Sequence, residues 1–219
     1  MNDLSAAQRA FLEAFTRSDL ASQYYLSGGT ALSAFYLHHR TSEDLDLFTR
    51  GAVDSSALLR LVGSVAEGPV VPRRLADRFG FIVPLRGETV RVEFVRYDHP
   101  AIEAPAARFG ALRVDGLRDI LANKLSAIVD RNEPKDFADV YCLLSRAGLS
   151  LEQGIADAKA KFGWPALELL QSAFLRIDQM TDWPALDPPA DVEEARRAFR
   201  GWARSLIRLE DDEPSPSER

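Results

Sequence analysis

Residues 42–48 read SEDLDLF, and this run decides the fold that the sequence predicts. Polar and apolar side chains alternate along it, which is the period of a β-strand. Leu45 and Leu47 are expected to face a core, with Asp44 and Asp46 together on the opposite face. Two carboxylates on one strand face repel each other, and a hard divalent cation is the usual compensation. The other interpretation is an acidic edge strand that faces solvent.

A third carboxylate is expected on a second strand, at residues 90–97. Apolar residues there alternate with Arg91 and Glu93, so Glu93 points away from the core. Three carboxylates together can hold two metal ions, one activating an attacking oxygen and the other stabilising a leaving oxygen. The alternative is that Glu93 pairs with Arg91 or Arg96 on an exposed face.

Ahead of the acidic strand, residues 27–30 read SGGT, between a short apolar run and a helical run. Two glycines let the backbone approach a ligand closely, and the free N–H groups at a helix start favour anions. Ser27 can hydrogen-bond a phosphate, and Thr30 is expected to cap the helix. A double glycine is more often a simple turn, but its place shortly before the acidic strand favours phosphate binding.

The periodicity of the chain changes near residue 113. Before it the predicted elements are mixed, with helices at 5–17, 31–38 and 54–65 and strands at 24–26, 44–48, 79–85 and 90–97, the last two joined by a turn. After it only helical spacing occurs, at 115–131, 135–147, 151–162, 165–177 and 192–209. We predict an α/β (α+β) fold with a small mixed-sheet lobe at 1–112 and a helical lobe at 113–210 that closes one side of a cleft. The acidic tail at 211–219 is expected to be disordered.

The composition limits the functional classes. The chain of 219 residues is 46% hydrophobic and has one cysteine, so it can form a core without disulfides, as in a reducing cytoplasm. It contains no apolar run near the roughly 18 residues that a membrane span needs, and we expect a cytoplasmic protein. The net charge of -6 argues against diffuse nucleic-acid binding. Residues 73–135, however, carry 12 basic and 9 acidic side chains, which leaves room for an anionic substrate.

Two strings together resemble a known signature: SGGTAL at 27–32 and HRTSEDLDLF at 39–48. They are similar to the nucleotidyltransferase superfamily related to DNA polymerase β and, more narrowly, to the AbiEii/AbiGii toxin family of abortive-infection and toxin–antitoxin systems. The strings NKLSA at 123–127 and PKDFADVY at 134–141 strengthen the narrower match. The motifs cover roughly residues 24–144, and the rest of the chain is helical where the family is helical.

The resemblance implies an Mg²⁺-dependent enzyme whose substrate is a nucleoside triphosphate. Gly28, Gly29 and Thr30 would hold the triphosphate, and Ser42 would lie beside it. Asp44 and Asp46 would bind the metal, and Glu93 would be a less regular third ligand. Lys124 would contact the nucleotide, and Asp136 and Asp139 would belong to the last acidic motif.

Helical spacing supports part of this assignment. Lys124 and Arg131 are seven residues apart and share a helix face, which presents two cations to a polyphosphate. Asp136 and Asp139 are three apart and also share a face. The alternatives are a solvated surface lysine and a pair of acids favoured by a helix N-terminus.

The residues give little information about the acceptor of the reaction. The resemblance implies an RNA end, with transfer RNA as the first candidate, inhibition of translation, and a cognate antitoxin. Arg73 and Arg74, expected in a loop, are candidates for contacting such an RNA. The alternatives are an enzyme of the same fold that modifies a protein or small molecule, and a non-catalytic nucleotide- or RNA-binding module. The presence of both Asp44 and Asp46 favours an enzyme.

Overall fold

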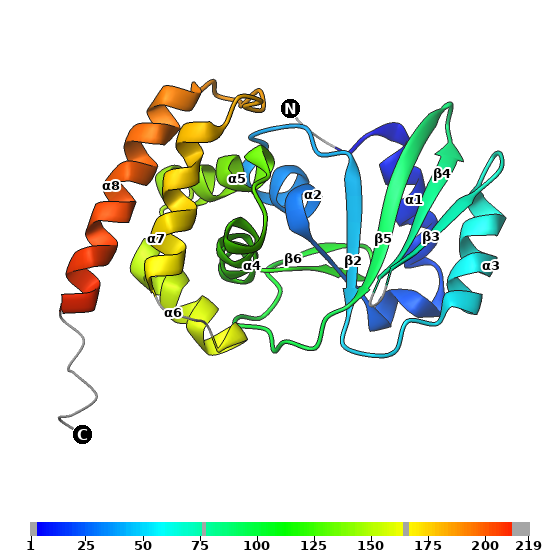
Figure 1. The fold of residues 1–219 in the computed structure, drawn as a ribbon. Coiled ribbons are helices and arrows are strands. Elements are labelled where there is room, and N and C mark those ends of the chain that lie inside the picture. The colour runs from blue at the N-terminus through cyan, green and yellow to red at the C-terminus, as the bar shows by residue number, and fades with distance from the viewer. Residues whose placement is uncertain (1–3, 76–77, 164–166, 212–219) are drawn as a thin grey trace. The chain divides into compact units, whose positions relative to one another are not determined.

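The computed structural model of the chain describes residues 4–75, 78–163 and 167–211, and Figure 1 shows its fold. The chain forms two compact units, Met1–Ile120 and Leu121–Arg219, and each is described by itself. The tail predicted to be disordered lies outside the described residues, except for Asp211 at the end of the last helix.

The first unit is built on a seven-stranded mixed sheet in the order β3-β4-β5-β2-β1-β7-β6. Strand β2 runs parallel to β5 and antiparallel to β1, and β1 runs parallel to β7. The strands are β1 Tyr25–Ser27, β2 Asp44–Thr49, β3 Val71–Leu75, β4 Arg78–Leu85, β5 Glu88–Arg96, β6 Ala107–Phe109 and β7 Leu112–Val114. The predicted mixed α/β fold is confirmed.

One face of this sheet forms the core. Leu45 and Leu47 are completely buried, as the alternating pattern predicted. Phe94, the partner of Leu47 on β5, lies on the same face, and the Phe15 ring of α1 (Ala6–Thr16) packs against it at 5.8 Å. Burial of these apolar side chains leaves the opposite face, with Asp44 and Asp46, for polar chemistry.

The helices of this unit begin at recognisable caps, with one correction. Ser5 closes a capping box before α1, and Asp54 accepts two backbone N–H groups at the start of α3 (Ser55–Val65). The prediction that Thr30 caps the next helix is wrong. Helix α2 (Gly28–Leu32) begins earlier, with Ser27 at its N-cap, and continues as the π-helical turn Ser33–Leu37.

Three strands were missing from the prediction, and one of them carries Arg73 and Arg74. The expectation that these arginines lie in a loop is wrong, since they belong to β3, which pairs antiparallel with β4 at the sheet edge. This edge strand has exposed charged residues and Pro72, so its sequence does not show the alternation of polar and apolar side chains that predicts a strand. The predicted turn between β4 and β5 is confirmed, and its two residues, Arg86 and Gly87, both have positive φ, as a type I′ hairpin turn requires.

The second unit is helical, and helix α4 crosses the boundary between the units. Its helices are α4 Leu117–Asp130, α5 Pro134–Ser145, α6 Leu151–Phe162, α7 Leu167–Leu175 with the 3-10 turn Arg176–Gln179, and α8 Val192–Asp211. The rings of Phe137, Phe174 and Phe199 form its core, with Phe199 centred 5.3 Å and 5.2 Å from the other two. In the parts of the chain that the structure describes, no helix combines the length and the apolarity of a membrane span.

Candidate active site

A row of residues crosses the sheet at Asp46. Asp46 is in register with Ser27 on β1 and with Glu93 on β5, and Glu93 is in register with Gly80 on β4. Partners in register project from the same face of a sheet. Asp46 and Glu93 are therefore neighbours, and Asp44 lies two residues along β2 on that face. The structure thus brings the three predicted carboxylates onto one side of the sheet.

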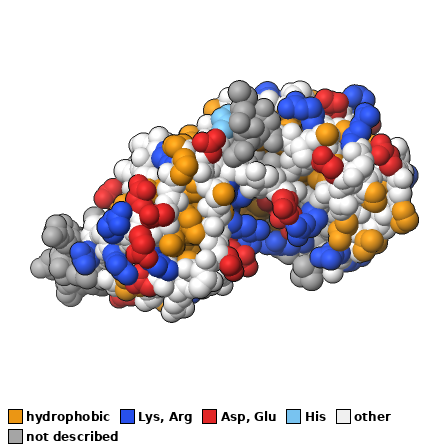
Figure 2. Space-filling model, turned by 90° about the horizontal axis from the view of Figure 1, so that it is seen from above, with side chains coloured by type: hydrophobic (Ala, Val, Ile, Leu, Met, Phe, Trp, Pro, Cys, Tyr) orange, Lys and Arg blue, Asp and Glu red, His pale blue; other side chains and the backbone are white. Residues whose placement is uncertain are grey.

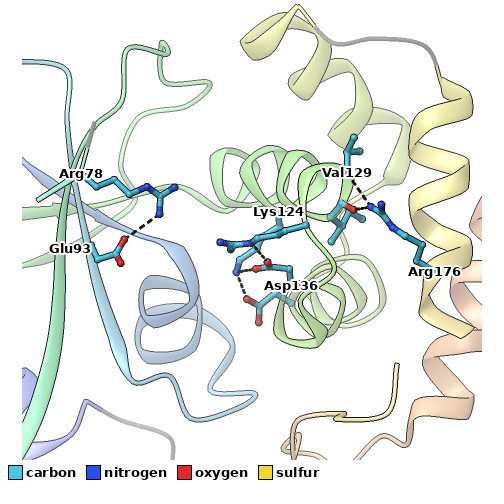
Figure 3. A network of polar contacts seen from close by, with 9 residues as sticks. Arg78, Glu93, Lys124, Val129, Asp136 and Arg176 are labelled. Atoms are coloured by element: carbon cyan, nitrogen blue, oxygen red, sulfur yellow. Dashed lines mark hydrogen bonds and ion pairs between the residues drawn. The ribbon is translucent and has the colours of Figure 1, made fainter. Parts of the chain in front are cut away.

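Arginines compensate the negative charge of this row. Arg91 Nε lies 3.1 Å from Asp44 Oδ1, and another nitrogen of the same guanidinium lies 2.8 Å from Glu43. Arg78 lies 3.2 Å from Glu93, and Figure 3 shows the two side chains pointing toward each other. Glu93 thus has an arginine partner, though neither of the two considered from sequence. All these side chains are at least partly exposed, so each ion pair contributes little to stability.

Steric contacts explain why two glycines stand at the start of α2. Gly28 has a φ of +72°, and a Cβ atom there would lie 2.2 Å from Asp46 Oδ2. A Cβ atom on Gly29 would lie 2.5 Å from the Arg40 guanidinium and 3.0 Å from Ser42 Oγ. The start of α2 can therefore approach the Asp46 carboxylate and Ser42 only because both positions lack a side chain.

The hydroxyl groups predicted to bind phosphate have internal partners. Ser27 Oγ donates a hydrogen bond of 2.7 Å to Asp115, and Thr30 Oγ1 donates one of 2.5 Å to the Asp44 carbonyl. Both residues are 1% exposed. Ser42 is half-buried and, together with Arg91, lines a surface pocket of about 460 Å³. Of these three hydroxyl residues, Ser42 is the one whose surroundings are open.

In the helical unit, Lys124 lies between two buried carboxylates. Its Nζ atom is 2.6 Å from Asp136 Oδ1 and 2.6 Å from Asp139 Oδ2, and Arg131 Nε is 2.6 Å from the other oxygen of Asp136 (Figure 3). Both aspartates are completely buried, and Lys124 is 6% exposed. The shared faces predicted for these residues are confirmed, and the alternative of a solvated surface lysine is wrong.

The charges of this cluster control the ionisation of Asp136. Burial raises the pKa of its carboxyl group, but the Lys124 ammonium and the hydrogen-bonded Arg131 guanidinium lower it by more, so the net pKa lies below the ordinary value. Asp136 is therefore a carboxylate at neutral pH, where it forms ion pairs with Lys124 and Arg131.

The predicted residues thus form two groups: the carboxylate row with Gly28 and Gly29 in the sheet unit, and the Lys124 cluster in the helical unit. Among the described residues, no three His, Cys, Asp or Glu side chains are gathered as a metal cluster. Metal binding by Asp44, Asp46 and Glu93 therefore stays a prediction. Sequence reasoning missed the ion pairs of Arg78 and Arg91 and the hydrogen bond that Asp115 accepts from Ser27. Such contacts depend on strand register, which one sequence does not reveal.

Comparison with known proteins identifies the family of the chain. A family model described as "Nucleotidyl transferase AbiEii toxin, Type IV TA system" matches residues 10–218. A protein of Aquifex aeolicus (strain VF5), named uncharacterized protein aq_aa25, is 30% identical over 165 residues, which are 74% of this chain and 77% of that protein.

Two crystal structures share the fold. One, described as "putative nucleotidyltransferase from H. pylori", has a TM-score of 0.60 at 20% identity and covers 94% of this chain and 95% of its own. The other, JHP933 from Helicobacter pylori, has a TM-score of 0.58 at 20% identity and covers 93% of this chain and 90% of its own. Because the family model spans nearly the whole chain, this protein belongs to the AbiEii family of nucleotidyl transferases, the toxins of type IV toxin–antitoxin systems.

Proposed function

We propose that the protein transfers a nucleoside monophosphate from a nucleoside triphosphate to a hydroxyl group at an RNA end, with transfer RNA as the first acceptor to test. One observation carries the proposal: Asp44, Asp46 and Glu93 share a sheet face, with Asp46 against the glycine backbone at the start of α2. Family membership supports the reaction type, and the acceptor rests on the resemblance alone.

The oxygen ligands of the carboxylate row are of the chemical type that a hard divalent cation prefers. Asp44, Asp46 and Glu93 offer oxygen ligands, and their charges are compensated by Arg91 and Arg78, whose exposed guanidinium groups can move into solvent at small cost. We propose that these carboxylates hold Mg²⁺. When bound, Mg²⁺ would neutralise phosphate oxygens and lower the pKa of the attacking hydroxyl group.

The residues of the chain would mainly position the substrates. The acceptor oxygen forms a bond to the α-phosphorus while the bond to pyrophosphate breaks, and the hydroxyl group loses its proton. Because Gly28 and Gly29 lack side chains, Asp46 and Ser42 come close to the backbone at the start of α2. We propose that the backbone N–H groups there and the Ser42 hydroxyl group contact the triphosphate. We also propose that Lys124, Arg131, Asp136 and Asp139 serve nucleotide binding in the helical unit.

Two further proposals concern the cell. The type IV toxin family implies a cognate antitoxin, and we propose that this protein has one and acts in the cytoplasm. One alternative, an enzyme that modifies a protein or small molecule, predicts label in those acceptors. The other, a non-catalytic nucleotide- or RNA-binding module, predicts no labelled product.

The test is incubation of purified protein and Mg²⁺ with each labelled triphosphate in turn, offering total RNA, cell protein or small molecules as acceptors. We expect label in RNA alone. Label in protein or in small molecules would overturn the RNA assignment, and no turnover with any acceptor would overturn the enzyme assignment.

A further inference from the structure

Four aromatic rings form a continuous ladder in the sheet unit. The ring of Tyr25 lies 5.8 Å from Phe48, Phe48 lies 4.8 Å from Tyr97, and Tyr97 lies 4.8 Å from His99. They come from β1, β2 and the segment after β5, so three separate parts of the chain contribute to the ladder.

The ladder begins beside the carboxylate row. Phe48 lies two residues after Asp46 on the same face of β2. Its partner in register, Tyr25, lies two residues before Ser27 on the antiparallel strand β1. Two residues of a strand span roughly 7 Å, which is about the distance from a phosphate to a base across one ribose. The rings therefore lie where a base would lie if its phosphate were at Asp46.

The rings do not behave as core residues. Tyr24 and Phe94, on the other face of the sheet, are 1% and 0% exposed, whereas all four rings of the ladder are only half-buried. Aromatic rings that remain partly exposed provide a surface on which planar groups can stack.

The two end rings line a pocket of about 340 Å³, together with Arg50, Arg113 and Gln23. Its acidic side chains bind the protein itself. Asp119 accepts backbone N–H groups of Ile102 and Glu103, and Asp115 accepts the Ser27 hydroxyl. The hydrogen bonds to Asp119 hold the segment after β5, which carries Tyr97 and His99, in place beside the pocket.

We propose that this ladder and its pocket bind a nucleobase, by stacking on the rings and by hydrogen bonds to the polar lining. The inference rests on the proposed nucleotidyl transfer and adds the residues that recognise the base. Burial raises the pKa values of Tyr25 and Tyr97, so both phenols stay neutral at physiological pH. The base can belong to the incoming triphosphate or to the terminal nucleotide of the acceptor.

The test removes rings without removing bulk. Tyr97→Leu and His99→Leu are compared with Tyr97→Phe and His99→Phe, which keep an aromatic ring, and with Phe109→Leu. Phe109 is a matched control, because it is a half-buried ring of the same unit that packs on Phe35, outside the ladder. Calorimetry would measure binding of a nucleoside triphosphate, of inorganic tripolyphosphate, and of a short single-stranded RNA, all with Mg²⁺.

We expect each leucine variant to weaken binding about 5- to 100-fold, the loss that follows removal of one stacking partner, and each phenylalanine variant to restore it. Loss for the triphosphate alone assigns the ladder to the incoming base, and loss for RNA alone assigns it to the acceptor base. Unchanged binding of both, or an equal loss for tripolyphosphate, which has no base, would overturn the inference. The proposed transfer is tested separately from base binding. It fails if turnover of the triphosphate does not depend on Asp46.

Discussion

Lys124, which the family resemblance assigns to nucleotide contact, also stabilises the helical unit. Its ammonium group is buried between Asp136 and Asp139, which have no exposure of their own. Each charge in such a cluster is stable only while its partners are present. Substitution of Lys124 is therefore expected to destabilise the helical unit, whatever its effect on nucleotide binding.

We predict that Lys124→Ala lowers the free energy of unfolding by about 3–5 kcal/mol, because it leaves two buried carboxylates without their shared cation. Lys135→Ala, an exposed lysine of the neighbouring helix, is the control and should change it by less than about 0.5 kcal/mol. Urea unfolding measures both. Wild-type stability in Lys124→Ala would contradict the structural role.

Nucleotide binding by this cluster is better tested at Arg131, whose side chain is 48% exposed. Arg131→Gln should weaken triphosphate binding while the fold persists, since Lys124 still compensates Asp136. Equal triphosphate affinities in Arg131→Gln and wild type, measured by calorimetry, would remove Arg131 from the proposed site.

The lowered pKa of Asp136 predicts a dependence of stability on acid. The unfolded carboxyl group, with a pKa of about 3.8, takes up a proton before the folded one does as the pH falls. The stabilisation is therefore complete above roughly pH 5 and is lost as pH falls below about 4. In urea unfolding from pH 7 to pH 3, wild type should lose its advantage over Asp136→Asn in this window, and a constant difference would refute the assignment.

At the scale of elements, the start of α2 is set by sterics as well as by propensity. We predict that Gly28→Ala destroys transfer activity, because its Cβ atom would collide with the Asp46 carboxylate. Gly87→Ala is a matched control, with a φ of +74° but no atom within 4 Å of the added Cβ. Both variants pay about 1–2 kcal/mol for the positive φ, so stability should fall in both and activity only in Gly28→Ala. Activity retained in Gly28→Ala would mean that this contact is not needed.

Strand β3 separates two arginines that sequence reasoning treated alike. Arg73 is in register with Gly80, which places it in the row of Glu93 and Asp46, whereas Arg74 projects from the opposite face. We predict that Arg73→Glu weakens RNA binding and its salt dependence more than Arg74→Glu does, while triphosphate binding is spared in both. Filter binding across salt concentrations measures this, and an equal or reversed order would contradict the placement.

Much of the fold could be predicted from the sequence, because its strongest signals are local. Alternation placed β2 with Leu45 and Leu47 in the core, and the helix predicted at 54–65 corresponds to α3. The edge strand β3 and the three-residue strands β6 and β7 were missed, since their residues are mostly exposed or too few to show a period. The partners of Asp44 and Glu93 were not predictable either, because they depend on how β4, β5 and β2 align.

For the whole molecule, charge limits how RNA can be bound. The net charge is -6, and Figure 2 shows Lys and Arg side chains beside Asp and Glu side chains on the face drawn there. A molecule of this kind is not attracted to RNA over its whole surface. RNA recognition therefore has to come from local features, such as Arg73 and the aromatic ladder.

The central claim, transfer of a nucleotide to RNA at the carboxylate row, is tested most directly by labelling RNA ends with Asp46→Asn beside wild type. Asp46→Asn keeps the shape of the side chain and removes its charge, and Asp98→Asn, in an exposed ion pair with Arg96, is the control. We predict that wild type and Asp98→Asn label RNA ends and arrest growth when expressed, and that Asp46→Asn does neither while its melting temperature is retained. RNA left unlabelled by wild type during active triphosphate turnover, or labelled equally by Asp46→Asn, would contradict the account.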